Sequence, residues 1–359
     1  FLLKLKLMMI LLLNYSYLFL KHQSGYTGAE LVDILAKHPG FSLETLYVSE
    51  HSADAGQLVS QCHANLIGVC DLPLIPINDE ILAQIALNCD AIFLATPHEA
   101  SHDWMPVLAG KRAVIYDLSG AFRIADKNVF AKYYGFEHQC DEWREQAVYG
   151  LAEWYPQQIT EASVIAVPGC YPTASLTGLK PLASASLLTD TRPIINAVSG
   201  VSGAGRKASM VNSFCEVSLQ AYGILSHRHQ PEIEAYLGQP IIFTPHLGNF
   251  KRGILATITA QLAPGTTQAQ VDAAFTQSYA DTPCVRLRER APKIDDVVNT
   301  PFCDVFYQYD AESQYIVVTT AIDNVLKGAA AQAVQCANLS QQYPISAGLI
   351  PTINHKGEL

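Results

Sequence analysis

The chain of 359 residues is long enough for two domains, and its 49% hydrophobic and 16% charged residues are typical of a globular protein rather than a disordered one. A net charge of −10 without clustered lysines or arginines argues against nucleic acid as a partner. The nine cysteines form no CxxC pair. That pattern argues against structural zinc and a disulfide framework and fits a reducing compartment.

The first 21 residues combine charge and hydrophobicity in an unusual way. Lys4 and Lys6 precede fourteen mostly apolar residues, 7–20, as in a signal peptide. No small-residue cleavage site follows, and a helix needs about 20 residues to span a bilayer, so no membrane association is expected. Three interpretations stay open: an altered first strand of a sheet, which we favour, a membrane-targeting segment, or an ordinary buried element.

The next segment carries only part of a nucleotide-binding loop. Gly25 and Gly28 lead into a helical pattern over 28–37, which ends at the His-Pro-Gly of 38–40. His22 stands where such a loop has its first glycine, and a side chain there obstructs the tight turn. We therefore expect a dinucleotide to bind this loop weakly rather than not at all.

From Gly25 to about Val167, short apolar strands alternate with helices. A helix is predicted over 80–87, and strands are predicted over 43–49, 90–96, 112–120 and 162–169. This alternation predicts a parallel sheet covered on both faces, the doubly wound α/β nucleotide-binding fold. Ser49 ends the second strand and tolerates a 2′-phosphate, which favours NADP(H), although Glu50 beside it leaves NAD open.

The pattern changes after Cys170. Longer alternating segments, typical of an antiparallel or mixed sheet, occupy 192–200, 239–248, 252–262 and 313–323. We predict a dinucleotide-binding domain over 1–169 that is completed by a C-terminal helix over 324–345. A catalytic and oligomerisation α+β domain is predicted over 170–323, and a loose tail over 346–359.

The stretch AVPGCYPTA, residues 166–174, has the strongest chemical signal. A buried strand leads to Pro168, Gly169 and Cys170, and a helix begins directly afterwards. A cysteine at a helix N-terminus meets the positive end of the helix dipole, which is expected to lower its pKa and favour the thiolate. Cys170 is therefore the candidate nucleophile, and the other eight cysteines are interpreted as small structural thiols.

A thiol nucleophile needs a proton partner, and SHRHQPEI, residues 226–233, supplies His227 and His229. Pro231 is expected to end any helix or strand there. We favour acid/base work over metal binding because no third ligand lies at a suitable spacing, so no metal is expected. The sequence leaves open which histidine acts; in an extended segment both would point to one side.

Several loops offer groups for anions. SGVSGAGRKAS, residues 199–209, combines exposed amides with Arg206 and Lys207, which suit a phosphate or a carboxylate. Lys251 and Arg252 open a later strand. The alternative for 199–209 is a flexible loop tip. The stretches 94–102 and 117–123 follow strand C-termini, where doubly wound sheets bind ligands.

Eight motifs in order carry a specific resemblance. They are GYTGAEL, DLSGAFR, YGLAEW, VPGCYPTA, SGVSGAGR, HRHQPEI, FTPHLGNFKRGI and IDNVLKGAAAQA. Over residues 24–340 the chain resembles the N-acetyl-gamma-glutamyl-phosphate reductases of the semialdehyde dehydrogenase superfamily. The resemblance implies NADPH-dependent reduction of an acyl phosphate to an aldehyde in arginine biosynthesis, by a cytoplasmic homodimer or homotetramer. That family's loop reads G-A-S-G-Y-T-G, so this chain departs from it at His22.

The resemblance also implies roles for particular residues. Cys170 would be the nucleophile, and His227 and His229 the acid/base pair. From the loops and strand ends together with the resemblance, the candidate cofactor contacts are Ser24, Gly25, Tyr26, Thr27, Gly28, Ser49, Ser119, Gly120 and Asn324. Substrate contacts would come from Ser199, Gly200, Arg206, Lys251 and Arg252. Two alternatives stay open: a related aspartyl-phosphate reductase and a non-catalytic remnant with an impaired cofactor site.

Overall fold

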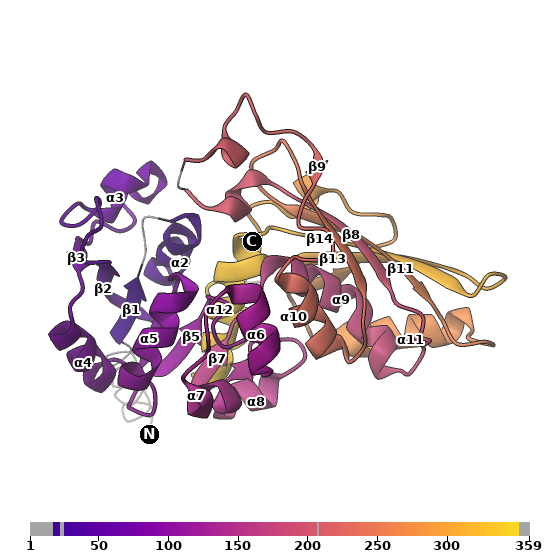
Figure 1. Ribbon diagram of the computed structural model, residues 1–359, viewed down its shortest axis with the longest axis horizontal. Coiled ribbons are helices and arrows are strands. Elements are labelled where there is room, and N and C mark those ends of the chain that lie inside the picture. Colours follow the sequence, from indigo (N-terminus) through magenta and orange to yellow (C-terminus); the bar gives the residue numbers. More distant parts are fainter. Residues whose placement is uncertain (1–16, 22–24, 207, 352–359) are drawn as a thin grey trace, which may run out of the picture.

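The computed structural model describes residues 17–21, 25–206 and 208–351. Within them the chain forms two seven-stranded sheets with their covering helices, and the sheets lie in separate lobes (Figure 1). The first lobe holds the N-terminal half of the chain, and the final helix returns to it.

The first sheet has the strand order β3-β2-β1-β4-β5-β7-β6, and every pair in it is parallel. Its strands are β1 (Tyr17–Lys21), β2 (Ser42–Val48), β3 (Leu74–Pro76), β4 (Ala91–Leu94), β5 (Val114–Asp117), β6 (Val148–Tyr149) and β7 (Val164–Ala166). Residues 17–21 pair with both β2 and β4, so this stretch is the first strand of the nucleotide-binding order. In the part of the chain that is described, no helix is long and apolar enough to cross a membrane.

Helices cover both faces of this sheet, which explains why all four residues of β4 are buried. They are α2 (Tyr26–Ala36), α3 (Val59–Cys62), α4 (Asp79–Asn88), α5 (His98–Leu108), α6 (Lys127–Tyr134), α7 (Asp141–Gln146) and α8 (Pro156–Glu161), with a 3-10 turn η1 (Ala64–Leu66). One core cluster includes Leu31 and Leu35 of α2, and a second includes Ile85 of α4 and Met105 of α5. The predicted doubly wound fold is confirmed.

The second sheet is mixed, as predicted, with the order β12-β13-β14-β11-β8-β10-β9. Its strands are β8 (Ile194–Ser199), β9 (Gln220–Ala221), β10 (Ile242–Leu247), β11 (Ile254–Gln261), β12 (Val285–Leu287), β13 (Cys303–Asp310) and β14 (Tyr315–Ile322). Burial alternates strictly along β11 because one face packs on α9 (Cys170–Ser184). Helices α10 (His229–Leu237) and α11 (Gln268–Tyr279) flank α9. Neither β13 nor α11 was predicted from the sequence.

The C-terminal segment differs from the single helix predicted over 324–345. It begins with a π-helical turn, η5 (Leu326–Ala330), and continues as α12 (Ala331–Ser340), which packs against α2 and α8. Residues 346–350, which were predicted as the start of a loose tail, make contacts with the first lobe. The Asn338 amide donates to the Ala347 carbonyl at 2.9 Å, and Gly348 packs against the His38 ring, so this stretch is held on the first lobe. Residues 352–359 lie outside the described chain.

Candidate active site

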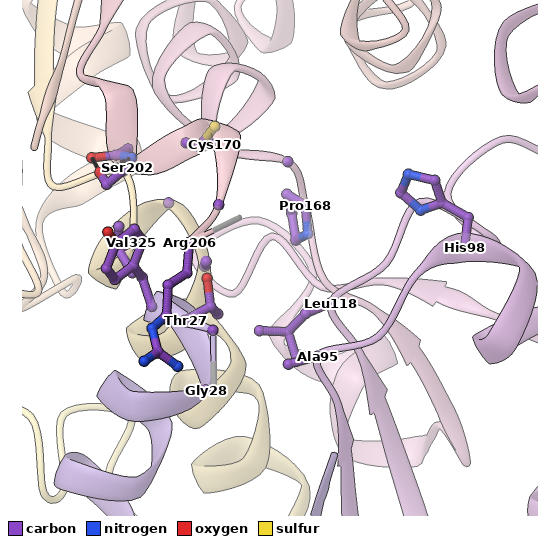
Figure 2. A pocket seen from close by; sticks show the side chains of 18 of the residues that line it. Thr27, Gly28, Ala95, His98, Leu118, Pro168, Cys170, Ser202, Arg206 and Val325 are labelled. Atoms are coloured by element: carbon purple, nitrogen blue, oxygen red, sulfur yellow. Dashed lines mark hydrogen bonds between the residues drawn. The ribbon is translucent and has the colours of Figure 1, made fainter. Parts of the chain in front are cut away.

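A cavity of about 640 Å³ lies between the two lobes (Figure 2). On one side are Gly25–Gly28 at the N-terminus of α2, and on the other is Cys170 at the N-terminus of α9. Ala95, Leu118 and Pro168, which follow β4, β5 and β7, form the floor between them. This is the carboxyl edge of the parallel sheet, where doubly wound folds bind ligands.

Cys170 is the first residue of α9, as predicted, but its thiol does not have the predicted lowered pKa. Burial raises the pKa of Cys170 to about 11, against smaller opposite effects from the Tyr171 backbone N–H and from Arg123. The helix N-terminus is present, but the loss of water around the sulfur outweighs it. The thiol is therefore protonated at neutral pH in this form of the protein.

His229 and His227 lie beside the cysteine at different depths. His229 lines the cavity, and its Nε2 packs so close to Gly169 that a Cβ on that glycine would lie 2.5 Å away. His227 is not among the lining residues; its ring centroid is 4.8 Å from that of His229, and its Nδ1 accepts the His229 backbone N–H at 3.1 Å. Within the described chain, the structure thus brings His229 to the cavity with His227 behind it.

Both imidazoles are held neutral. Burial and the neighbouring Arg228 lower the pKa of His227 to about 4. Burial, followed by His227 and Arg123, holds the pKa of His229 well below its usual value. The segment is the start of α10 rather than the end of an element, so the expectation for Pro231 was wrong. A proline in the first helical turn contributes no N–H that the helix would need.

A buried acidic group under the cysteine was missed from the sequence. Glu232 Oε1 accepts the Gly169 backbone N–H at 2.9 Å and the Tyr149 hydroxyl at 2.8 Å. Arg123 Nη1 lies 3.5 Å from Glu232 Oε2, and its Nε donates to the Val167 carbonyl at 2.7 Å. Glu232 and Arg123 each belong to a motif singled out from the sequence, but only the tertiary structure shows that they join β7 to α10.

The predicted cofactor residues divide into two groups. Gly25, Tyr26, Thr27, Gly28 and Asn324 line the cavity. Ser49, Ser119 and Gly120 do not line it: the Ser119 hydroxyl donates to Asp117, and the Gly120 N–H donates to His98 Nδ1. Ser24 and the His22 turn lie outside the described residues.

The predicted substrate residues also divide. Arg206 lines the cavity and pairs with Asp54 at 3.6 Å; Figure 2 shows its side chain extending toward the start of α2. Ser199 and Gly200 do not line the cavity. The space beside Gly200 is filled by the backbone of residues 251 and 252.

Lys251 and Arg252 line a neighbouring cavity of about 670 Å³, which shares Arg206 with the first. Arg252 pairs there with Glu30 at 2.6 Å and Asp323 at 2.5 Å. It therefore links α2 to the end of β14 instead of presenting a free guanidinium to substrate. Among the cavity residues that sequence analysis did not name are His98, whose pKa burial lowers to about 3, and the exposed Arg228. Across the described residues, no group of three or more His, Cys, Asp or Glu side chains is arranged to hold a metal.

Comparisons with known proteins agree with this geometry. Residues 23–162 match the semialdehyde dehydrogenase NAD binding domain, and residues 170–324 match the semialdehyde dehydrogenase dimerisation domain. The chain is 61% identical over 328 residues to the N-acetyl-gamma-glutamyl-phosphate reductase of Alteromonas mediterranea, covering 91% of this chain and 97% of that protein. The reductase of the same name from Pseudoalteromonas atlantica is 58% identical over 92% of this chain and 97% of its own length. The chain belongs to the N-acetyl-gamma-glutamyl-phosphate reductase family.

Solved structures with much lower sequence identity to this chain have the same fold. Aspartate semialdehyde dehydrogenase II from Vibrio cholerae superimposes with a TM-score of 0.68 at 17% identity, covering 91% of this chain and 98% of that one. The Candida albicans aspartate semialdehyde dehydrogenase with NADP gives a TM-score of 0.64 at 12% identity, covering 92% and 99%. At these identities the likeness supports the architecture alone.

Proposed function

We propose that the chain reduces N-acetyl-glutamyl 5-phosphate to N-acetyl-glutamate 5-semialdehyde with NADPH, in arginine biosynthesis, through a thioester on Cys170. One observation carries the proposal: the cysteine, a neutral histidine and the uncapped N-terminus of a nucleotide-binding helix line a single cavity. The relatives at 53–61% identity bear the name of this reductase, which favours it over an aspartyl-phosphate reductase and over a non-catalytic remnant.

The residues present fit NADP(H). No side chain caps the first N–H groups of α2, and Gly25 and Gly28 leave them open to the cavity, which suits a pyrophosphate. Arg206 adds a cation at the same end, where a phosphate of the cofactor could bind it. When bound, NADPH supplies the hydride that converts the thioester to a thiohemiacetal.

The chain's own groups account for the proton transfers. Because the thiol is protonated, His229 takes the proton as the sulfur attacks the acyl carbon; the C–S bond forms, the C–O bond breaks and phosphate leaves. After reduction, the C–S bond breaks, the aldehyde leaves and His229 returns its proton to the sulfur. Backbone N–H groups at the start of α9 face the developing oxyanion. His227 holds the segment through its contact with the His229 backbone.

We also propose that the protein acts in the cytoplasm as a homodimer or homotetramer. All nine cysteines are free, which suits a reducing compartment. Four apolar side chains of the second sheet are 37–41% exposed: Ile242 of β10, Ile194 of β8, and Tyr315 and Val317 of β14, which β11 separates from β8. The matching family domain is described as a dimerisation domain. An apolar sheet face of this kind suits an isologous contact with a second copy.

The test is the reverse reaction. Purified protein, N-acetyl-glutamate 5-semialdehyde, NADP and phosphate should give phosphate-dependent NADPH formation, which the Cys170→Ser variant lacks. Aspartate semialdehyde at equal concentration should be a poor substrate. Preference for aspartate semialdehyde would favour the aspartyl-phosphate alternative, and no activity with either substrate would favour the non-catalytic remnant.

A further inference from the structure

A buried ion pair lies behind the cavity and has no part in the chemistry above. Lys327 is 0% exposed and the side chain of Glu153 is 2% exposed, and their charged groups are 2.6 Å apart. Lys327 Nζ also donates to Gln332 Oε1 at 2.8 Å and Gln335 Oε1 at 2.7 Å, so its three hydrogens all have acceptors. Neither Lys327 nor Glu153 lines the cavity.

Such a pair is a poor way to gain stability. Removing two charges from water costs several kcal/mol per ion, and well-packed apolar residues are often as stabilising. Glu153 Oε2 adds to this cost because it is buried without a partner. The position of the pair therefore points to a role in placing its neighbours.

The first neighbour is the π-helical turn that contains Lys327. The Gly328 N–H donates to the Asp323 carbonyl, and the Ala330 N–H to the Val325 carbonyl, each at 2.9 Å across five residues. This widened turn brings Val325, Gly328 and Ala329 to the cavity wall. Gly328 touches the nucleophile directly, since a Cβ on it would lie 2.8 Å from the Cys170 Cβ. π turns are rare and frequent at functional sites.

The second neighbour is the start of α9. Gln332 accepts from Lys327 through Oε1 and donates through Nε2 to the Thr173 hydroxyl at 3.4 Å. The Thr173 hydroxyl donates in turn to the Gly169 carbonyl at 3.0 Å. Two chains of contact, one through Gly328 and one through Gln332 and Thr173, thus run from the same ammonium group to the two sides of Cys170.

We propose that Lys327 and Glu153 are positioning residues, whose buried ion pair fixes the π turn and the start of α9 so that the Cys170 thiol is held at the cavity. The inference rests on the proposed function for its catalytic consequence, but its structural content is independent of the substrate. Because Glu153 comes from the loop after β6 and Lys327 from the segment after β14, the pair also ties the nucleophile to both lobes.

The test compares the double variant Lys327→Met/Glu153→Gln, which leaves no unpaired charge, with wild type. A smaller perturbation is Thr173→Val, and Thr173→Ser is its conservative rescue. The matched control is Asp304→Asn, which breaks a different ion pair, that of Asp304 with Arg286. The Asp304 carboxylate is also fully buried but does not line the cavity. Three quantities are measured: the melting temperature, kcat against KM for NADPH, and the alkylation rate of Cys170 by iodoacetamide, followed by mass spectrometry of its peptide.

The double variant and Thr173→Val should lower kcat about tenfold or more and change the Cys170 alkylation rate at least about threefold, since a misplacement of about 1 Å can cost about 10²-fold. KM for NADPH should stay within about threefold, and Thr173→Ser should restore both quantities. Asp304→Asn should lower only the melting temperature. If the double variant melts earlier but keeps its kcat and alkylation rate, the pair is merely structural; if it does not fold, Thr173→Val against Thr173→Ser decides. An inactive wild type would refute the proposed function, while the alkylation rates would still judge this inference.

Discussion

Gly169→Ala tests how closely the histidine is fitted to the nucleophile. The added Cβ would lie 2.5 Å from His229 Nε2 and 2.9 Å from its Cε1, whereas ordinary contact begins at 3.4 Å. The ring must therefore move by about 0.9 Å, and it is only 8% exposed, so it has little free space. Gly169 has φ −68°, which alanine adopts, and alanine keeps the N–H that Glu232 accepts. The change thus acts on the histidine rather than on the backbone.

A displacement of about 1 Å in a catalytic group can cost about 10²-fold in rate, which is about 2.7 kcal/mol in the barrier. We expect kcat of Gly169→Ala to fall by about that factor while the dissociation constant of NADPH, measured by fluorescence titration, is unchanged. Gly178→Ala in the same helix is the control, because its Cβ would meet Ile258 Cδ1 at 2.8 Å, in the core and away from the cavity. Activity within about threefold of wild type in correctly folded Gly169→Ala would show that His229 is not the proton carrier.

Three further predictions follow from the same site and fold. His229→Asn should lower kcat by roughly 10²–10⁴-fold, whereas His227→Asn should lower it much less, and equal losses in steady-state assays would contradict the assignment of His229 alone. The melting temperature should fall as the pH is lowered from about 6.5, because burial lowers the folded-state pKa of His98 to about 3 and of His138 to about 4, so the unfolded chain takes up protons first. The melting temperature should also fall above about pH 9, because burial raises the folded-state pKa of Cys284 and Cys303 to about 12, so the unfolded chain loses these protons first. Constant stability from pH 7.5 to 5 in calorimetry would contradict the histidine part of this prediction. A variant with His22→Gly, Gln23→Ala and an apolar β-branched strand in place of residues 1–21 should bind NADPH at least about tenfold more tightly, roughly 1.4 kcal/mol. Unchanged affinity in a fluorescence titration would show that the His22 turn is compatible with the cofactor.

The first lobe was predictable because its signals are local. Short apolar strands such as 90–96, and the glycines that open α2, each report a buried parallel strand or a helix start without reference to distant residues. Cys170 was identified for the same reason, because residues 166–174 alone contain the end of a strand, a turn and the start of a helix.

What the sequence could not predict depends on tertiary contacts. The helix N-terminus at Cys170 was predicted, but the burial that raises its pKa comes from tertiary packing, including packing against the core around α9. Arg252 looked available for an anion because Glu30 and Asp323 are 222 and 71 residues away in sequence. The π turn was predicted as part of a regular helix, since helical periodicity does not reveal a bond that spans five residues.

The phosphate released in the absence of NADPH tests the central claim most directly. Mixing the purified protein with N-acetyl-glutamyl 5-phosphate alone should release about one phosphate per active site and leave an acyl group on the Cys170 peptide, detectable by its mass, because thioester formation precedes reduction. Cys170→Ser should give no such release and no acylated peptide. Release that requires NADPH, or an acyl group on a residue other than Cys170, would contradict the account.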